Sequence, residues 1–354
     1  MEIIKRVLTY LFSLLHKLIF PNKTVILLGN PYGNVSGHIK CCYDLLKLDN
    51  SNNVYIINNN SHESNNEITR FSLKTFILLL KSKTIIYTHS PTTDIFPIIP
   101  CDIKKINIWH GMPIKSIGYD SNIEKVWINN KSKNNLSPYL VNDLLIVSSK
   151  YWVNYFSKAW KFPKNKILPL GSIVSAYLQK NKDTITNQLM SVYSSKHKYI
   201  IFAPTFRNDK SDNDYINKTL SLFSKLAQYN FIIKLHPKLN LTFEKKYKNI
   251  LFSSQFDLFE LFMIADLLIT DYSSVFYEYL NLKSKCILYQ PDRLEYERLN
   301  GQLNPIEKGL TLFYSTNELE LEAQINYLMN KDNKSENSKN TIFDIKRFIN
   351  IINQ

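Results

Sequence analysis

The chain has 354 residues, and their number favours two domains with sizeable hydrophobic cores. With 44% hydrophobic residues, 13% aromatic residues and only 8 glycines, the composition excludes fibrous and low-complexity proteins. The formal net charge of +14 favours an anionic partner, which leaves nucleic acid, an anionic membrane surface or a phosphorylated substrate.

The first 22 residues predict an amphipathic helix that stops at Pro21. Apolar side chains recur at three- and four-residue steps from Ile4 to Ile19, and basic residues such as Lys5 and Lys17 fall opposite them. The apolar runs are too short to span a membrane, and the polar interruptions argue against a signal peptide. The helix therefore either packs on its own domain or lies in a membrane interface.

Short apolar runs then alternate with helical patterns in two successive series, over residues 23–185 and 186–354. The first series contains "KTVILLG", "KTIIYTH" and "KINIWH", and the second contains "KYIIFAPTF", "NFIIKLHP" and "DLLITDYSS". This alternation predicts parallel sheets with helices on both faces. We therefore expect an α/β protein of two doubly wound, Rossmann-like domains facing a cleft, with ligands beyond the carboxyl ends of the strands.

A histidine stands where the run "KINIW" ends, and Gly111 and Lys115 follow it. His110 is either hydrogen-bonded inside a turn or a general base, since an imidazole with a pKa near 6.5 suits proton abstraction at neutral pH. In the second interpretation, Lys115 is placed to hold an anion beside the base.

Two strand ends of the second series carry similar chemistry. In "APTFR", the Thr205 hydroxyl and the Arg207 guanidinium suit a phosphate or a polar acceptor, although a solvated loop explains this segment equally well. In "IIKLHP", a strand ends in His236 beside Lys234. One such histidine in each domain is harder to attribute to chance than one alone.

The segment "ITDYSSVFYEYL" gives the clearest signal for an anion site. A strand ends at Asp271, and Ser273 and Ser274 then stand at the start of a helix, where free N–H groups and hydroxyls bind phosphate. Glu278 is placed one turn later to accept from ribose hydroxyls. A plain serine cap is the alternative. We expect no dedicated metal site, since Asp271 is a lone carboxylate and the four cysteines lack metal-binding spacing.

In this order, "WHGMPIKSIG" (109–118), "APTFR" (203–207), "LHP" (235–237) and "TDYSS" (270–274) resemble the CDP-glycerol glycerophosphotransferase family, the teichoic acid primases and polymerases with their capsule-building relatives. The resemblance implies a GT-B fold and transfer of a polyol phosphate, expected to be glycerol phosphate, from a CDP-activated donor to a hydroxyl of a lipid-linked or glycan acceptor, releasing CMP. It implies His110 as the base, His236 near the donor diphosphate, and Ser273 and Ser274 as phosphate ligands.

The resemblance also implies a cytoplasmic enzyme bound peripherally to the inner face of the cell membrane, with residues 1–22 as its membrane-associating helix. It assigns residues 23–185 to the acceptor side and 186–354 to CDP-donor binding. CDP-polyol is then a substrate, no cofactor is expected, and dependence on Mg²⁺ is left open. One departure is that Val174 and Ala176 stand where the family usually has Arg and Asp.

Two other functions remain as alternatives. The first is a GT-B glycosyltransferase that uses a sugar nucleotide, since its fold and phosphate site would look alike. The second is a non-catalytic nucleic-acid binder that would account for the charge of +14. The basic residues are spread along the chain rather than gathered in aromatic-interleaved stripes, so we expect no nucleic-acid partner.

Overall fold

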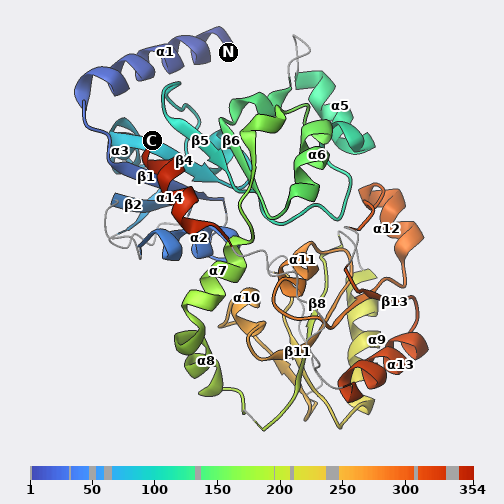
Figure 1. Ribbon diagram of the computed structural model, residues 1–354. Helices are drawn as coiled ribbons and strands as arrows, with labels where there is room; N and C mark the ends of the chain where they lie inside the picture. The colour runs from blue at the N-terminus through green and yellow to red at the C-terminus, as the bar shows by residue number, and fades with distance from the viewer. Residues whose placement is uncertain are drawn as a thin grey trace. The chain divides into compact units, whose positions relative to one another are not determined.

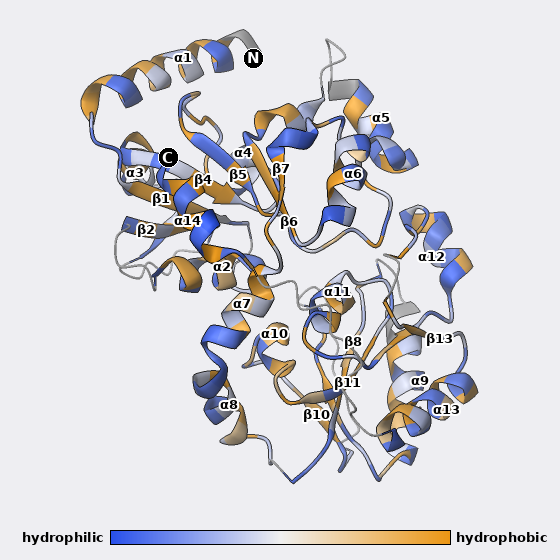
Figure 2. Ribbon diagram, viewed as in Figure 1, coloured by the Kyte–Doolittle hydropathy of each residue, from blue (hydrophilic) through white to orange (hydrophobic). Residues whose placement is uncertain are grey.

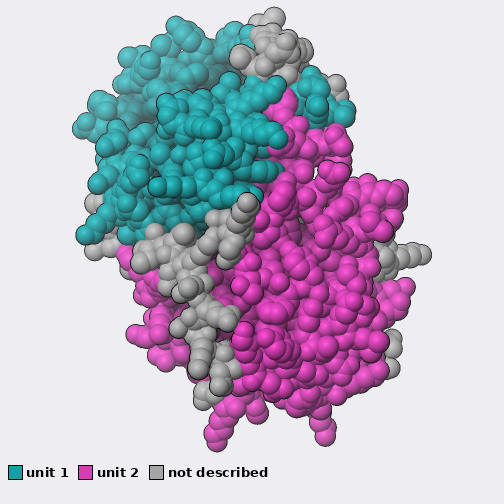
Figure 3. Space-filling view, turned by 45° about the vertical axis from the view of Figure 1, so that its right-hand side comes forward, with its two compact units in different colours: residues 1–112, 124–177, 341–354 teal, residues 113–123, 178–340 magenta. Residues whose placement is uncertain are grey.

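The computed structural model describes the chain except residues 1, 32, 48–52, 60–65, 132–136, 195, 208–210, 237–246, 307–309 and 332–342 (Figure 1). Its internal contacts form two compact units (Figure 3). Unit 1 comprises residues 1–112, 124–177 and 341–354, and unit 2 comprises residues 113–123 and 178–340. This grouping differs from the predicted domain division at residues 113–123, at residues 178–185 and at the C-terminal end. The assignment of acceptor and donor domains stays a prediction.

Unit 1 is built on a parallel sheet in which β1 (Val25–Asn30) and β4 (Ser82–Tyr87) are central and almost wholly buried. The outer strands are β2 (Asn53–Asn58) and β3 (Glu67–Thr69) on one side and β5 (Lys104–Asn107), β6 (Leu144–Val147) and β7 (Ile167–Pro169) on the other. The strand order is β3-β2-β1-β4-β5-β6-β7. Leucine and isoleucine at consecutive positions of the central strands explain burial on both faces.

The helices of unit 1 separate these strands along the chain and cover the sheet (Figure 1). They are α1 (Glu2–Ile19), α2 (Gly37–Lys47), α3 (Leu73–Lys81), α4 (Pro91–Asp94), α5 (Asn122–Lys131), α6 (Lys150–Ala159), α7 (Ile173–Lys180) and the C-terminal α14 (Ile345–Asn353), with short 3₁₀ turns at Pro138–Val141 and Lys164–Lys166. Helices α5 and α7 begin or end beyond the residues of unit 1.

Unit 2 repeats the architecture with a second parallel sheet, in the order β10-β9-β8-β11-β12-β13. Its strands are β8 (Tyr199–Ala203), β9 (Asn230–Ile233), β10 (Ile250–Phe252), β11 (Ala265–Thr270), β12 (Cys286–Tyr289) and β13 (Phe313–Ser315). Its helices are α8 (Lys182–Met190), α9 (Ser211–Lys225), α10 (Leu258–Leu261), α11 (Val275–Leu280), α12 (Arg293–Asn300) and α13 (Glu318–Asn330), with a 3₁₀ turn at Gly118–Asp120.

Both sheets reverse their winding direction next to their first strand. In unit 1 the chain adds β2 and β3 on one side of β1 and then returns to place β4 on the other. In unit 2 it adds β9 and β10 beside β8 before placing β11 on the other side. Such switch points leave a crevice at the carboxyl ends of the strands, where ligands of doubly wound sheets bind. The predicted α/β class with two parallel sheets is confirmed.

Helix α1 packs on unit 1 through a narrow inner face and exposes its leucines. Phe12 is buried and its ring stacks on that of Phe76 at 4.6 Å between centroids. His16 is also buried, with Nδ1 2.5 Å from Asp102 Oδ2 and Nε2 2.8 Å from the carbonyl of Ser82. Hydrophobic and hydrophilic residues alternate along the helix (Figure 2). Within the described residues, no helix combines the length and apolarity needed to cross a bilayer.

Candidate active site

The chain makes a sharp turn directly after β5, and this turn carries His110. Strand β5 ends at Asn107, so it is shorter than the sequence predicted, and "IWH" lies beyond its end. Trp109 has φ 55° and Gly111 has φ 117°, so both lie in the left-handed region, which a bulky residue such as Trp rarely adopts. The Asn107 side chain accepts from Trp109 N at 2.7 Å and holds the strained residue.

The His110 imidazole is held by a backbone carbonyl and by a second histidine. Its Nδ1 lies 3.3 Å from the carbonyl oxygen of Thr88, which can only accept, so Nδ1 carries the proton. Nε2 of the neutral ring then keeps its lone pair for an incoming hydroxyl. The His89 ring stacks on it at 4.5 Å, with an interplanar angle of 9°. His89 follows β4, the sheet neighbour of β5, and the sequence did not single it out.

His110 reaches solvent, yet the protein around the ring limits its hydration. This desolvation, followed by the positive charge that His89 would carry, lowers the pKa of His110 well below its ordinary value of 6.5. His38 acts in the same direction, whereas the hydrogen bond to Thr88 and the charge of Asp94 oppose the shift. The imidazole is therefore neutral at pH 7, as a proton acceptor must be.

A buried carboxylate fixes the carbonyl that orients His110. Asp94 Oδ2 accepts from the backbone N–H of Thr88 at 3.0 Å and from that of His89 at 2.9 Å. Asp94 is fully buried against Gly29 at the end of β1, where an added Cβ would stand 2.6 Å from the Asp94 Cβ. Glycine at position 29 is thus required by this close approach, and the switch point of unit 1 is shaped around Asp94.

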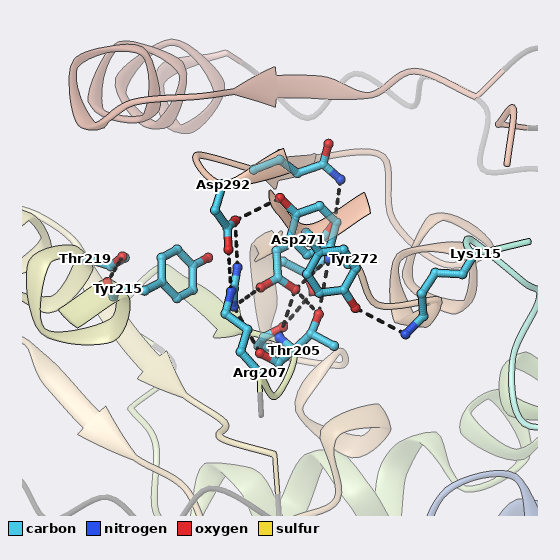
Figure 4. Close-up of polar contacts among 12 residues, drawn as sticks. Lys115, Thr205, Arg207, Tyr215, Thr219, Asp271, Tyr272 and Asp292 are labelled. Carbon is cyan, nitrogen blue, oxygen red and sulfur yellow. Dashed lines mark hydrogen bonds and ion pairs between the residues drawn. The ribbon is translucent and has the colours of Figure 1, made fainter. Parts of the chain in front are cut away.

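In unit 2 the motifs "APTFR" and "TDYSS" meet across the switch point, after the neighbouring strands β8 and β11 (Figure 4). Asp271 Oδ1 accepts from Thr205 N at 2.8 Å and Tyr272 N at 2.6 Å, and also from the Thr205 hydroxyl. Gln290, at the end of β12, donates to the carbonyl of Asp271 at 2.9 Å. Asp271 thus ties three loops together rather than standing alone.

Arg207 lies buried between two carboxylates (Figure 4). Nη1 contacts Asp271 Oδ2 at 3.0 Å, while Nε and Nη2 form a forked pair with Asp292 at 2.6 and 3.1 Å. The guanidinium also lies 4.0 Å from the ring centroid of Tyr215. These contacts favour a positioning role for Arg207, and its predicted contact with substrate stays a prediction.

Burial and pairing oppose each other in this cluster. Burial alone would lower the pKa of Arg207, but the hydrogen bond to Asp292 and the charge of Asp271 raise it above its ordinary value. Burial would raise the pKa of Asp292, but the bonds from Arg207 and Tyr272 lower it. Both groups therefore stay charged near neutral pH. Burial raises the pKa of Asp271, and the charge of Arg207 and the hydrogen bonds from Thr205 and Tyr272 oppose that shift.

The other predicted residues of unit 2 lie near the same strand ends. Ser274 caps α11 without a side-chain hydrogen bond to the helix, while the Ser273 hydroxyl accepts from Val275 N at 3.3 Å. Glu278 is buried in α11. His236, after β9, is exposed and its ring centroid lies 6.0 Å from that of Phe206. Lys234 donates to the carbonyl of Phe256 at 2.5 Å, and burial lowers its pKa. Pro237, the last residue of the "LHP" motif, lies outside the described residues.

Lys115 belongs to unit 2 although it follows His110 closely in the chain. Its Nζ lies 3.2 Å from the Tyr296 hydroxyl, and the Tyr296 ring stacks on that of Tyr272 at 3.6 Å. Val174, where the resemblance leads one to expect arginine, is fully buried in α7 and offers no polar contact. Among the described residues, no group of three or more His, Cys, Asp or Glu side chains is placed to hold a metal.

Comparison with known proteins gives one family. A family described as CDP-glycerol:poly(glycerophosphate) glycerophosphotransferase matches residues 10–349. The chain is 29% identical over 241 residues to the teichoic acid glycerol-phosphate primase of Bacillus subtilis (strain 168), covering 65% of this chain and 61% of the relative. It is also 29% identical over 217 residues to the teichoic acid ribitol-phosphate primase of Bacillus spizizenii (strain ATCC 23059 / NRRL B-14472 / W23), covering 57% and 55%. Less than two thirds of each relative is thus spanned.

Solved structures support the fold. The wall teichoic acid polymerase TagF superposes with a TM-score of 0.70 at 20% identity, over 98% of this chain and 93% of that one. UDP-N-acetylglucosamine 2-epimerase from Rickettsia bellii superposes with a TM-score of 0.59 at 13% identity, over 94% and 96%. At such identities the likeness concerns architecture, and chemistry has to be argued from the residues themselves.

Proposed function

Because the chain belongs to the CDP-glycerol:poly(glycerophosphate) glycerophosphotransferase family, we propose that it transfers a polyol phosphate from a CDP-activated donor to an acceptor hydroxyl. Glycerol phosphate is the group that the family description names, and the relatives include both glycerol- and ribitol-phosphate primases. The acceptor is a lipid-linked or glycan chain of the teichoic acid type.

The observation that carries the proposal is the contact of His110 Nδ1 with the carbonyl oxygen of Thr88 at 3.3 Å. With the Nδ1 proton engaged by Thr88, the Nε2 lone pair accepts the proton of the acceptor hydroxyl. The acceptor oxygen attacks the phosphorus that bears the polyol, and a new P–O bond forms. The bond from that phosphorus to the bridging oxygen of CMP breaks, and CMP leaves with the bonding electrons.

The donor side of the reaction falls to unit 2. We assign the donor diphosphate to the loop at Ser273 and Ser274, with Thr205, Lys234 and His236 offering further polar atoms around the same strand ends. The Arg207–Asp271–Asp292 cluster gives this loop a fixed shape, which lowers the cost of ordering it on binding. His236 is the side chain assigned to charge on the phosphates.

A donor panel tests the reaction. Purified protein is offered CDP-glycerol, CDP-ribitol, UDP-sugars and CMP-sugars with a lipid-linked acceptor, and nucleotide release is followed. Release of CMP that requires both a CDP-polyol and the acceptor is the expected result. Turnover of a sugar nucleotide alone would replace the proposal with the glycosyltransferase alternative.

We further propose that α1 holds the enzyme on the inner face of the cell membrane. The side chains opposite its inner face are exposed, with Ile4 at 63%, Leu11 at 49% and Leu18 at 77%. Lys5 and Lys17 belong to the same helix and suit anionic headgroups, where attraction is about 1 kcal/mol per cation near the surface. The exposed leucines favour a helix that lies in a membrane interface over the alternative of a helix that buries its apolar side chains on its own domain.

Two variants of this helix separate the outer face from the inner one. Leu11→Glu with Leu18→Glu should lower co-sedimentation with vesicles containing phosphatidylglycerol by about tenfold or more, because apolar burial in the interface is lost. The melting temperature should hold, since both leucines are exposed. Phe12→Ala should do the reverse and lower stability. Unchanged vesicle binding by the double variant would contradict the proposal.

A further inference from the structure

Unit 1 contains a cavity of 490 Å³ at the amino ends of strands β4 and β5. Its walls come from the first residues of these strands and from the carboxyl-terminal ends of helices α1 and α14. His110 follows β5, so it stands beyond the opposite, carboxyl ends of the same parallel strands. The cavity is therefore separate from the candidate active site.

The cavity is strongly basic. Four lysines line it: Lys17 in the last turn of α1, Lys23 after that helix, Lys83 of β4 and Lys104 of β5. Asp102 is the one acidic side chain among the described residues that line it, and His16 Nδ1 already lies 2.5 Å from its Oδ2. The lysines come from different segments of the chain, so the fold brings them together.

Helix capping accounts for part of this charge. Lys23 donates to two carbonyls at the end of α1, and Lys104 Nζ donates to Ile351 O of α14 at 2.7 Å. A helix end carries about half a negative charge, so the two ends and Asp102 offset about two of the four positive charges. A carboxylate at Gln354, which also lines the cavity, would still leave positive charge in excess.

This excess has a cost that a bound anion would relieve. Lys83 Nζ donates to the uncharged Asn353 side chain, with 2.6 Å between Nζ and Oδ1. Burial lowers the pKa of Lys83, and the positive charge of Lys104 lowers it further. An anion held between the two ammonium groups would offset their repulsion.

The size of the cavity and its position favour a phosphate group that belongs to a larger molecule. A volume of 490 Å³ falls in the range of about 300–1,000 Å³ that organic ligands occupy, and ammonium groups bind phosphate well. Directly beside Lys17, α1 presents Leu18 and Ile19, which are exposed. Basic pockets next to a membrane surface bind the headgroups of anionic lipids.

We propose that this cavity binds the phosphodiester headgroup of an anionic phospholipid. The proposal rests on the proposed position of α1 at the membrane, and it adds a site of defined lipid chemistry to that contact. Lys83 and Lys104 belong to strands and not to α1, so they strengthen membrane binding only when a headgroup enters the cavity.

The variant Lys83→Gln with Lys104→Gln removes two charges and keeps amides that can still donate to Asn353 and Ile351. Co-sedimentation with vesicles of phosphatidylcholine and phosphatidylglycerol should weaken about 30-fold, because two cations are lost. Co-sedimentation with pure phosphatidylcholine vesicles and the melting temperature should stay close to those of the parent. Unchanged binding to the phosphatidylglycerol vesicles would overturn the proposal.

Two double variants serve as controls. Lys164→Gln with Lys166→Gln lowers the net charge equally, at a 3₁₀ turn of unit 1 that does not line the cavity, and should bind as the parent does. An equal loss there would show attraction by overall charge and overturn the proposal. Lys83→Arg with Lys104→Arg keeps both charges and should keep the binding. A loss as large as that of the glutamine variant would indicate a packing role instead.

A single variant covers the case in which the double glutamine variant does not fold. Lys83→Gln alone leaves the bond from Lys104 to α14 in place, and it should weaken binding to phosphatidylglycerol vesicles about 5-fold. Binding equal to that of the parent would again overturn the proposal.

Two further measurements separate the source of the phosphate and the role of α1. A rise in melting temperature with inorganic phosphate over chloride at equal ionic strength, absent in the glutamine variant whose vesicle binding is unchanged, would assign the cavity to free phosphate and overturn the lipid assignment. Leu11→Glu with Leu18→Glu should lose binding to both kinds of vesicle. Retained binding to both would remove the membrane position of α1, on which the proposal rests.

Discussion

At the carboxyl end of the unit 1 sheet, two stacked histidines lie beside the switch point, whereas the switch point of unit 2 holds a buried arginine between two carboxylates. Both arrangements stand on the same strand order, in which the first strand of the unit along the chain is the sheet neighbour of the fourth: β1 beside β4, and β8 beside β11. Among the described residues no carboxylate bonds the His110 ring, although Asp94 Oδ2 lies 3.6 Å from Nδ1 of His89, and desolvation favours the neutral form of His110. In the arginine cluster, Arg207 pairs with both Asp271 and Asp292.

The difference separates two tasks that one topology can serve. A neutral imidazole with a lone pair can gain and lose a proton during each turnover. A guanidinium fixed by two carboxylates can do neither, but it gives the surrounding loops a single shape, because leaving any one of the three charges unpaired in the interior is costly. We therefore expect substitutions in the histidine pair to alter rate and pH dependence, and substitutions in the arginine cluster to alter stability and donor binding.

The largest expected effect is on rate, at His110. His110→Asn removes the lone pair that accepts the proton, and turnover should fall ~10²–10⁴-fold. CDP affinity by calorimetry and the melting temperature should be retained, because the donor site and its supporting cluster lie elsewhere in the chain. His197→Asn, at an exposed position where the ring contacts that of Tyr199, is the control and should be fully active. Near-normal turnover of His110→Asn would end its role as base.

The next effect is on stability, at Arg207. Arg207→Met leaves Asp271 buried without its counter-ion, and breaking a buried pair typically costs about 3–5 kcal/mol in the free energy of unfolding. Arg293→Met removes a helix-surface pair with Glu297 and should cost only about 0.3–0.5 kcal/mol. Denaturant unfolding of the two variants measures the contrast. Equal stabilities would show that the cluster does not hold the loops.

The smallest effect is a shift in pH dependence, at His89. Because His89 is the second cause that lowers the pKa of His110, His89→Phe, which keeps an aromatic stack without the charge, should raise that pKa. The acid limb of kcat/KM should then move to higher pH, toward 6.5. His38→Phe should shift it the same way by less, since the contribution of His38 is smaller. An acid limb that stays in place would exclude His89 as an influence on the base.

Periodicity was enough to predict the class of fold and the strands that end in the motifs, because buried parallel strands are written as continuous apolar runs. The short edge strands β3 and β13 carry too few residues to give such a signal. The "TDYSS" loop was interpreted correctly as the end of a strand and start of a helix, and Asp271 was expected to position that turn rather than to hold a metal, but its distant partners were not foreseen. Arg207 and Gln290 are among the partners of Asp271. No local sequence pattern predicts a contact between positions so far apart in the chain.

His89 and Asn304 also show that the sequence does not predict contacts between residues distant in the chain. His89 ends the run "KTIIYTH", so a signal existed, but the stacking on His110 requires knowing that β4 and β5 are neighbours. Asn304 lies in the irregular stretch "NGQLNP", where nothing marks it as the partner of a segment about 190 residues earlier in the chain. Periodicity predicts which residues are buried, whereas long-range pairing decides which polar groups act together.

Two histidines contact backbone carbonyls at opposite ends of strand β4, so the length of this strand sets the distance between the two contacts. His16 of α1 bonds the carbonyl of Ser82 where the strand begins, and His110 bonds that of Thr88 just after it ends. Six residue steps at about 3.3 Å each separate these carbonyls by roughly 20 Å. With α1 resting on a bilayer, an acceptor rooted in that bilayer has to extend up to this distance before its hydroxyl meets the imidazole. If α1 lies on the bilayer as we propose, a carrier that already bears several sugar or polyol units is expected to be a better acceptor than a bare lipid phosphate.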